Sequence, residues 1–321
     1  MSPVTPAWSL VDKTHLVPCP LCDGRQFRVL IESDRYDMDL QTVGCMDCGL
    51  AMSNPQPTPA ALDEFYTHHY RHYYQKVEQP SEAYIREYRK DERAAETASY
   101  LRSQGVLPKD GSVLDIGASE GCILKALRDL EPGLHLVAVE PNPTFGAFAV
   151  THAGCTLHQS LEPVKAAGSH FDLIILNHVF EHLASPVDYL QELSQLLTPR
   201  GCIYIDVPDL AHYTGLESLH IAHLYHFSQR TLSAVARRAG CEVKALEAHA
   251  PVMHPKSIRT LLKAGGKPAT PPPSFLPEGW DLLLCINRKA GRYHRRRWSL
   301  SRRLKLWLTT RLSRRPRVVA C

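Results

Sequence analysis

Short apolar runs alternate with amphipathic stretches through the middle of the chain. These runs predict β-strands over residues 112–116, 134–139, 171–176 and 202–207. Apolar residues at helical spacing between the runs predict helices, among them 122–130 and 186–197. Short buried strands that alternate with helices are typical of a parallel sheet with both faces covered. The pattern therefore predicts an α/β domain.

Two later apolar runs, 241–246 and 281–286, predict the last strands of this sheet. The stretch between them, 250–280, contains three consecutive prolines and a pair of glycines, so we expect a Pro-rich loop insertion there. Ahead of the sheet, residues from about 60 to 104 combine charged residues and tyrosines at helical spacing. These residues predict helices that pack against the next domain.

The composition is that of a globular protein. Of 321 residues, 44% are hydrophobic and 22% are charged, which argues against global disorder. No apolar run approaches the roughly 20 residues that a membrane-spanning helix needs. The first ten residues carry neither a basic region nor an apolar core, so a secretory signal is not expected. We expect a cytoplasmic protein.

Charge is unevenly distributed along the chain. Residues 288–321 hold 13 lysines and arginines and no acidic residue, which leaves 24 basic against 33 acidic residues elsewhere. Trp298, Leu304 and Trp307 recur at helical spacing among the arginines. A basic amphipathic helix with tryptophan suits the surface of an anionic membrane, and we expect peripheral association with the inner membrane. RNA binding and a merely solvated tail are the alternatives, and nucleic acid is the less favoured partner.

Four of the ten cysteines form two C-x-x-C pairs with 22 residues between the pairs. The pairs are Cys19 with Cys22 and Cys45 with Cys48. A glycine near each pair permits the tight turn that lets two thiolates face one ion. Two such pairs complete a tetrahedral Zn²⁺ site without an open position, so the metal is expected to be structural. A redox C-x-x-C motif and an iron–sulfur cluster are the alternatives.

These features predict four consecutive segments. They are a zinc ribbon over 1–57, a helical linker or cap over 58–108, the α/β domain over 109–289 with its insertion at 250–280, and a basic amphipathic tail over 290–321.

A glycine-rich turn follows the first predicted strand of the sheet. The sequence Asp115-Ile-Gly117-Ala-Ser-Glu-Gly121 runs directly into a predicted helix, and the second strand ends in Glu140. Glycines let the backbone turn sharply and approach a ligand at a helix N-terminus, while a carboxylate accepts hydrogen bonds from ribose hydroxyls. A dinucleotide-binding dehydrogenase also places an acid about 20 residues after its glycines, so this turn alone does not separate the two classes.

The order and spacing of several motifs resemble the class I S-adenosylmethionine-dependent methyltransferases over roughly residues 107–288. The motifs are the Asp115 turn, Glu140, the run Phe171–Leu183 and the run Leu197–Pro208. The resemblance implies a Rossmann-like seven-stranded sheet with an antiparallel end pair and S-adenosylmethionine as cofactor. It implies contacts to that cofactor from Asp115, Gly117, Gly121, Glu140, Ser160, Leu161 and Asn177. Ser119 stands where the middle glycine of this turn is common in the family.

The ribbon ahead of such a domain resembles the sugar C-methyltransferases of deoxysugar pathways and bacterial glycan-tailoring methyltransferases. The Glu-His pair of that family, which precedes a Tyr and a Ser, corresponds here to Ala222-His223-Leu-Tyr225-His226-Phe-Ser228. His223 matches the family histidine, whereas Ala222 replaces the glutamate. The resemblance implies that His223, with Tyr225 and His226 beside it, lies at the acceptor site.

Methyl transfer to a hydroxyl, or to a carbon next to a ketone, needs a base whose pKa is near neutral, and imidazole suits that role. Histidines follow the third and fourth predicted strands, where ligands bind in open α/β sheets. Our first candidate base is His223, followed by His226, with His178 as a further candidate. We expect a methyltransferase acting on a sugar, sugar nucleotide or glycan. A small natural-product or lipid hydroxyl is the alternative acceptor, and a non-catalytic binding scaffold is the alternative from another class.

Overall fold

The computed structural model describes residues 14–32, 34–35, 40–70, 77, 79–269, 278–295 and 318–320. The chain divides into two units, each assembled from segments distant in the sequence. Unit 1 comprises residues 1–69, 210–231 and 270–321, and unit 2 comprises residues 70–209 and 232–269. The expected division into four consecutive segments stays a prediction.

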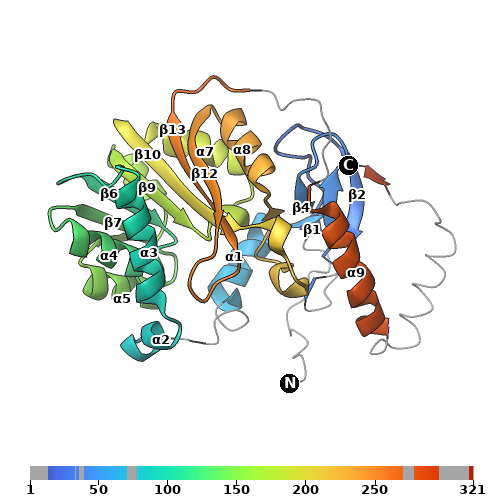
Figure 1. Ribbon diagram of the computed structural model, residues 1–321, viewed down its shortest axis with the longest axis horizontal. Helices are drawn as coiled ribbons and strands as arrows, with labels where there is room; N and C mark the ends of the chain where they lie inside the picture. Colours follow the sequence, from blue (N-terminus) through green and yellow to red (C-terminus); the bar gives the residue numbers. More distant parts are fainter. Residues whose placement is uncertain are drawn as a thin grey trace. The chain divides into compact units, whose positions relative to one another are not determined.

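A seven-stranded sheet forms the centre of unit 2, in the order β12-β13-β10-β9-β6-β7-β8 (Figure 1). Its strands are β6 (Ser112–Ile116), β7 (His135–Val139), β8 (Thr156–His158), β9 (Phe171–Asn177), β10 (Leu197–Pro208), β12 (Cys241–His249) and β13 (Ser257–Ala264). From β8 to β10 all neighbours are parallel, and β13 runs antiparallel to both β10 and β12. The predicted α/β class and the seven-stranded sheet with its antiparallel end pair are confirmed.

The identity of the last strand was predicted wrongly. The stretch 250–280, expected to be a loop, contains β13, and the run 281–286, expected to be a strand, lies in helix α9 (Trp280–Arg295). Leu283 and Ile286 of that run are buried, as is Trp280 just before it. A spacing of three places them on one face of a helix, and a short apolar run does not distinguish a strand from a buried helical turn.

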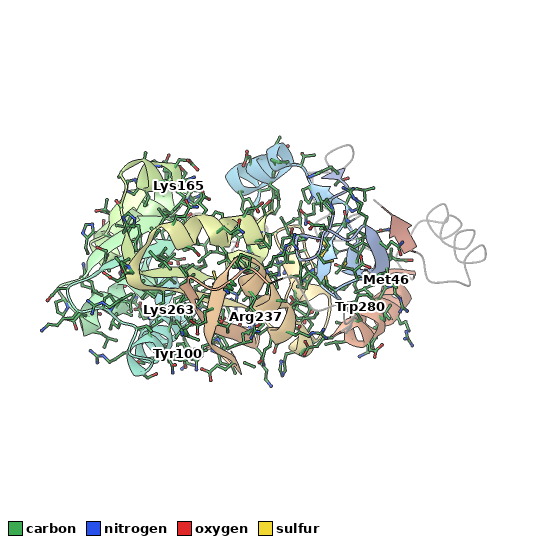
Figure 2. The ribbon with its side chains drawn as sticks, turned by 90° about the horizontal axis from the view of Figure 1, so that it is seen from above. Met46, Tyr100, Lys165, Arg237, Lys263 and Trp280 are labelled. Carbon is green, nitrogen blue, oxygen red and sulfur yellow. The ribbon has the colours of Figure 1, made fainter. Side chains whose placement is uncertain are left out.

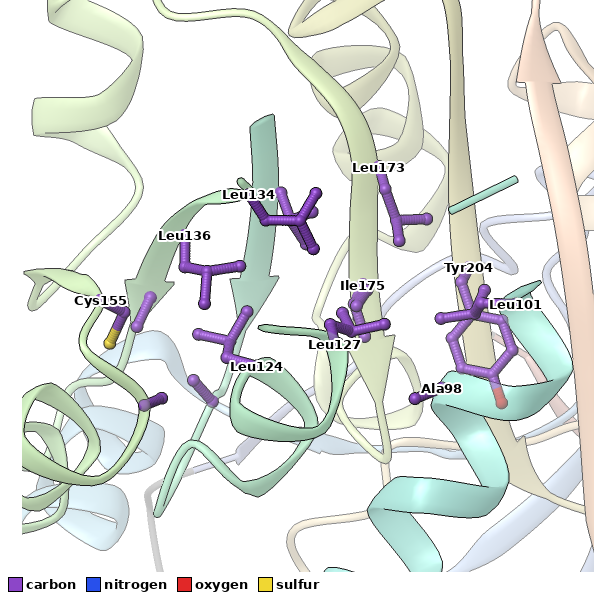
Figure 3. Close-up of a cluster of buried hydrophobic side chains, with 14 of the residues drawn as sticks. Ala98, Leu101, Leu124, Leu127, Leu134, Leu136, Cys155, Leu173, Ile175 and Tyr204 are labelled. Atoms are coloured by element: carbon purple, nitrogen blue, oxygen red, sulfur yellow. The ribbon is translucent and has the colours of Figure 1, made fainter. Parts of the chain in front are cut away.

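Helices of unit 2 cover its sheet. They are α2 (Glu82–Glu87), α3 (Lys90–Ser103), α4 (Cys122–Leu130), α5 (Pro143–Ala153), α6 (Glu162–Ala166), α7 (Pro186–Gln195) and most of α8 (Gln229–Arg238). Figure 3 shows Ala98 and Leu101 of α3 beside Tyr204 of β10, within a buried cluster that includes Leu124 and Leu127 of α4. Each fully buried leucine contributes about 1.5–3 kcal/mol, so this cluster fixes α3 and α4 on one face of the sheet.

Unit 1 contains an antiparallel five-stranded sheet in the order β11-β4-β3-β2-β14. Its strands are β2 (Gln26–Ile31), β3 (Thr42–Cys45), β4 (Ala51–Ser53), β11 (Tyr225–His226) and β14 (Val318–Ala320). A separate pair, β1 (Thr14–His15) with β5 (Gln56–Pro57), precedes helix α1 (Pro59–His68). The segment between the two C-x-x-C pairs carries short apolar runs near residues 26–31 and 41–43 that predict strands, and β2 and β3 confirm them. The pairing of β4 with β11 was not foreseen.

Helix α9 packs on the cysteine-bearing strands of unit 1. The Trp280 indole N–H donates a hydrogen bond to the carbonyl oxygen of Gly49, at 3.0 Å. A Cβ atom on Gly44 would lie 2.1 Å from the Trp280 ring, so only glycine fits beneath the indole. Figure 2 shows Met46 close to Trp280, and both belong to the same hydrophobic cluster. Residues late in the chain therefore complete the core of the N-terminal ribbon.

Among the helices that the structure describes, none is both long and apolar enough to cross a lipid bilayer. The predicted amphipathic tail helix falls mostly on residues 296–317, which lie outside the described residues. Its membrane role therefore stays a prediction.

Candidate functional site

The glycine-rich turn of unit 2 joins β6 to α4 in a backbone conformation that favours glycine. Gly117, Ser119 and Gly121 all have positive φ angles, of 73°, 51° and 77°. A Cβ on Gly121 would lie 3.0 Å from the Cβ and 3.2 Å from the Cα of Ala149 on α5. Helix and turn therefore approach more closely than a side chain would allow. Ser119 thus adopts a left-handed conformation that glycine would take without strain.

Glu140 holds this turn from the next strand. Its side chain is buried and accepts hydrogen bonds from the backbone N–H of Ser119 (3.0 Å, to Oε2) and of Asn142 (2.9 Å, to Oε1). Glu140 therefore orients the turn.

Two more charged residues fix the turn from α3. The Lys90 Nζ donates to Glu120 Oε1 at 2.7 Å, and Glu120 is buried while Lys90 is partly buried. Burial disfavours the charged form of Glu120, but the Lys90 ammonium outweighs it and the pKa of Glu120 is lowered. Glu120 therefore stays ionised at neutral pH, and its hydrogen bond with Lys90 ties the turn to α3. No local pattern predicts this pair, because its members are 30 residues apart.

Asp115 ends up in a different environment from Glu140. Burial, and then the nearby negative charge of Glu140, raises the pKa of Asp115 to about 8, from an ordinary value of 3.8. The carboxyl group is therefore mostly protonated at neutral pH while the site is free of ligand. A neutral carboxyl group donates a hydrogen bond, which an ionised one cannot do.

This raised pKa predicts a pH-dependent loss of stability. Between pH 3.8 and about 8 the folded protein holds a proton on Asp115 that the unfolded chain has released, so the free energy of unfolding falls as pH rises through this window. Asp115→Asn removes the ionisation, and its melting temperature should exceed that of the wild type by about 5 °C or more at pH 8.5, but by little at pH 4. Thermal melts across pH test this, with the exposed Asp188→Asn as control. A difference that is the same at all pH values would contradict it.

The other predicted cofactor residues lie at the same edge of the sheet. Asn177 is the last residue of β9, which pairs directly with β6. The backbone N–H of Glu140 donates to the carbonyl of His158 on β8, two residues before Ser160. Ser160 is exposed and Leu161 is buried. The carboxyl ends of β6, β7, β8 and β9 thus bring together all seven residues predicted for the cofactor.

The candidate bases separate into two groups. His178 directly follows β9 in unit 2, where its Nδ1 lies 3.5 Å from Oε1 of the buried Glu181. His223, Tyr225 and His226 belong to unit 1. We expected all these histidines at strand ends of the sheet, but β11 carries Tyr225 and His226 and pairs with β4 of the ribbon instead. The sequence placed this segment after β10 correctly and gave no signal for where it pairs.

Contacts within unit 1 hold the second group. The His226 Nδ1 and Tyr213 Oη are 3.1 Å apart, and the His223 Nδ1 lies 3.0 Å from the Ser218 carbonyl oxygen. The Tyr225 hydroxyl accepts a hydrogen bond from Gln56 (3.2 Å), and burial raises the pKa of this phenol. The phenol is therefore neutral at physiological pH.

The two C-x-x-C pairs come together in unit 1. The Sγ atoms of Cys19 and Cys48 are 3.5 Å apart, as are those of Cys22 and Cys45, and all four sulfurs lie within 4.8 Å of one another. In tetrahedral zinc sites each sulfur lies about 2.3 Å from the metal, which brings the sulfurs this close together. Backbone turns close each pair, with the Gly49 N–H donating to the Cys45 carbonyl at 2.9 Å. The donor set and its spacing fit a Zn²⁺ ion.

Two functional candidates escaped the sequence analysis. Asp206 and His249 lie at the ends of β10 and β12, and the His249 Nε2 is 2.9 Å from Asp206 Oδ2. A carboxylate at a strand end is a visible signal, but its partner is 43 residues away. Only the strand order brings the two together.

Comparison with known proteins gives a consistent result. A family model described as a methyltransferase domain matches residues 85–246. A ubiquinone biosynthesis O-methyltransferase of Roseobacter denitrificans is 35% identical over 95 residues, which cover 28% of this chain and 38% of that protein. An uncharacterized methyltransferase of Mycolicibacterium gilvum is 28% identical over 140 residues, covering 42% of this chain and 54% of that protein. The matches to the first two curated relatives span only about two fifths of their length.

A solved structure of magnesium protoporphyrin IX methyltransferase from Synechocystis is also similar. It has a TM-score of 0.47 and 12% sequence identity, and the alignment covers 64% of this chain and 99% of that one.

Proposed function

Because the chain belongs to the methyltransferase-domain family, we propose that it transfers a methyl group from S-adenosylmethionine to an acceptor that is a sugar, sugar nucleotide or glycan. The observation that carries the proposal is the turn between β6 and α4, whose left-handed residues lie against Glu140. A binding scaffold has no physical need for such a turn next to a buried carboxylate.

Each residue around the turn has a defined task in this proposal. Gly117 and Gly121 let the backbone approach the cofactor, Glu140 accepts hydrogen bonds from the ribose hydroxyls, and Asn177 lies near the amino-acid end. Ser160 and Leu161 lie beside the adenine. S-adenosylmethionine supplies a methyl group activated by its sulfonium, so the protein mainly aligns the acceptor, excludes water and takes up a proton.

A second acceptor class is favoured by one specific observation. The curated relatives matched with at least 30% identity are named as ubiquinone biosynthesis O-methyltransferases, which favours a small-molecule or lipid hydroxyl as acceptor. The ribbon of unit 1, which lies outside the matched residues 85–246, favours the sugar or glycan class through its resemblance to sugar methyltransferases.

We also propose that Cys19, Cys22, Cys45 and Cys48 hold a structural Zn²⁺ ion. Four thiolates fill the coordination of zinc, so the ion stabilises the ribbon and takes no part in the chemistry.

Calorimetry with S-adenosylhomocysteine tests the cofactor, and transfer of labelled methyl from S-adenosylmethionine tests the acceptor. We expect binding with a Kd in the micromolar range and label in sugar nucleotides or glycans. Label in a hydroxylated quinone precursor would instead favour the second class. If S-adenosylhomocysteine produced neither heat of binding nor a shift in melting temperature, the non-catalytic binding scaffold would be the remaining hypothesis.

A further inference from the structure

The carboxyl ends of β9, β10 and β12 carry a buried polar cluster that the cofactor site does not use. At its centre is Asp206, two residues before the end of β10 and 2% exposed. Its Oδ2 accepts hydrogen bonds from the Tyr204 hydroxyl (3.2 Å) and from the His249 Nε2 (2.9 Å). One oxygen of this carboxylate is therefore satisfied and fixed in direction.

The other oxygen of Asp206 is not satisfied. Oδ1 is buried and has no hydrogen-bond partner among the described residues, and the same holds for the Nε2 of His178. These two atoms lie 3.9 Å apart, too far for a direct hydrogen bond. Buried polar atoms almost always have partners, so two orphaned atoms facing each other indicate a missing one.

The backbone and Glu181 hold His178 in position for such a partner. Its φ of 55° is unusual for a residue other than glycine, and its N–H donates to the Asp206 carbonyl at 2.8 Å. Burial disfavours the charged form of Glu181, but His182 and His178 outweigh it and hold the pKa of Glu181 well below its usual range. An ionised carboxylate 3.5 Å from Nδ1 favours the tautomer with its proton on Nδ1. Nε2 then presents a lone pair.

This pair of atoms lies next to the cofactor turn. Val179 follows His178 in the chain, and a Cβ on Gly117 would lie 2.5 Å from its Cγ2. β9 and β6 are also direct neighbours in the sheet. Because Val179 contacts the turn at Gly117, a group bound between Asp206 and His178 would lie close to the turn that is proposed to hold the methyl donor.

We propose that Asp206 Oδ1 and His178 Nε2 bind the two neighbouring hydroxyls of a vicinal diol, so that the acceptor is a 1,2-diol. The inference rests on the proposed function and names the chemistry of its acceptor. Two hydrogen-bond acceptors this close require two donors. One water molecule provides both, and a vicinal diol provides them on adjacent oxygens and displaces that water.

The two positions have different roles. The hydroxyl at His178 passes its proton to Nε2 while its oxygen forms a bond to the methyl carbon. The carbon–sulfur bond breaks and its electron pair stays on sulfur, giving the methyl ether, S-adenosylhomocysteine and a protonated imidazole beside Glu181. The hydroxyl at Asp206 keeps its proton, and its hydrogen bond to the carboxylate determines which of the two hydroxyls faces His178. His178 is then a catalytic residue, and His249 is a positioning residue that acts through Asp206.

The turn between β12 and β13 packs against this site. His254 lies on that turn, and its ring centroid is 3.9 Å from that of His178. Its neighbour Met253 is 63% exposed, so the turn borders solvent. Both a sugar diol and a catechol present the required pair of hydroxyls.

Matched acceptors test the diol. One arm compares catechol with phenol, and the other compares methyl riboside with methyl 2-deoxyriboside, with kcat/KM for S-adenosylhomocysteine formation as the readout. In at least one arm the diol should be preferred by about 10- to 100-fold, the worth of one hydrogen bond to a charged group. Asp206→Asn should reduce that preference to about twofold or less. The arm that responds identifies the source of the diol.

Further variants separate binding from folding. His178→Asn should lower kcat at least about 100-fold, the typical contribution of a general base. His249→Ala should weaken the diol preference and His249→Gln, which keeps a donor, should restore it. All variants, together with the control Asp172→Asn at the opposite end of β9, should bind S-adenosylhomocysteine within about twofold of the wild type. If the wild type binds the cofactor but shows no diol preference in either arm, this inference is overturned and the proposed function is not. That holds whether the diol and its matched acceptor turn over equally or not at all. Loss of cofactor binding by the wild type would overturn the proposed function.

Discussion

Glu140→Ala should lower the affinity for S-adenosylhomocysteine by about 100-fold or more. Two hydrogen bonds from ribose hydroxyls to the carboxylate are worth about 1.5–3 kcal/mol each, and about 1.4 kcal/mol corresponds to a factor of ten. The substitution also removes the acceptor for the N–H groups of Ser119 and Asn142, so the turn between β6 and α4 loses its anchor. Calorimetric titration measures the change.

Two controls show whether the loss is specific. Glu242→Gln, an exposed carboxylate on β12 of the same unit, should bind the cofactor product as the wild type does. Glu140→Gln keeps an acceptor and a similar shape, so its affinity should lie between those of the wild type and Glu140→Ala. Affinity for Glu140→Ala within about threefold of the wild type, with an unchanged melting temperature, would mean that the ribose lies elsewhere.

Cys48→Ser should remove the zinc ion and unfold the ribbon of unit 1. Structural zinc contributes about 10–16 kcal/mol in small zinc domains, more than the total stability of most domains. The wild type should contain about one zinc per chain by elemental analysis, and the variant far less. The free energy of unfolding of unit 1 should fall correspondingly, as should that of the wild type after treatment with a strong chelator.

The matched control for this prediction is Cys285→Ser on α9, an exposed cysteine of the same unit. It should keep its zinc and its stability. All residues proposed to hold the cofactor lie in unit 2, so Cys48→Ser should still bind S-adenosylhomocysteine. Full zinc content in Cys48→Ser would show that the four cysteines are not the metal site.

The sequence predicted four of the five parallel strands, β6, β7, β9 and β10, because each is a largely apolar run that is mostly buried. The fifth, β8, was missed because it has only three residues and none of them is fully buried. β13 was missed because Arg259, Thr260 and Lys263 interrupt its apolar pattern, although it lies between two other strands. α9 was mistaken for a strand because a run of six apolar and polar residues fits both periods. Tertiary packing against Gly44 and Gly49 decides between them, and no local pattern contains that information.

In the candidate site, too, some features follow from local sequence patterns and others depend on tertiary packing. Asp115, Gly117, Gly121 and Glu140 sit at the ends of consecutive strands, so their meeting follows from the strand order that the sequence already indicates. The meeting of Asp206 with His249 depends on β13 lying between β10 and β12, an insertion that reverses the chain order of the last two strands. The pairing of Tyr225 and His226 with the ribbon depends on contacts across more than 170 residues.

Unit 1 is built from segments that lie far apart in the sequence, and this affects how the protein folds during synthesis. A ribosome releases β2, β3 and their cysteines early, yet β11 and α9, which complete their sheet and core, emerge roughly 180 and 240 residues later. Until then the nascent ribbon exposes an unpaired strand edge at β4 and apolar side chains awaiting Trp280. Such surfaces invite aggregation, so early metal capture or chaperone shielding would matter most during this interval.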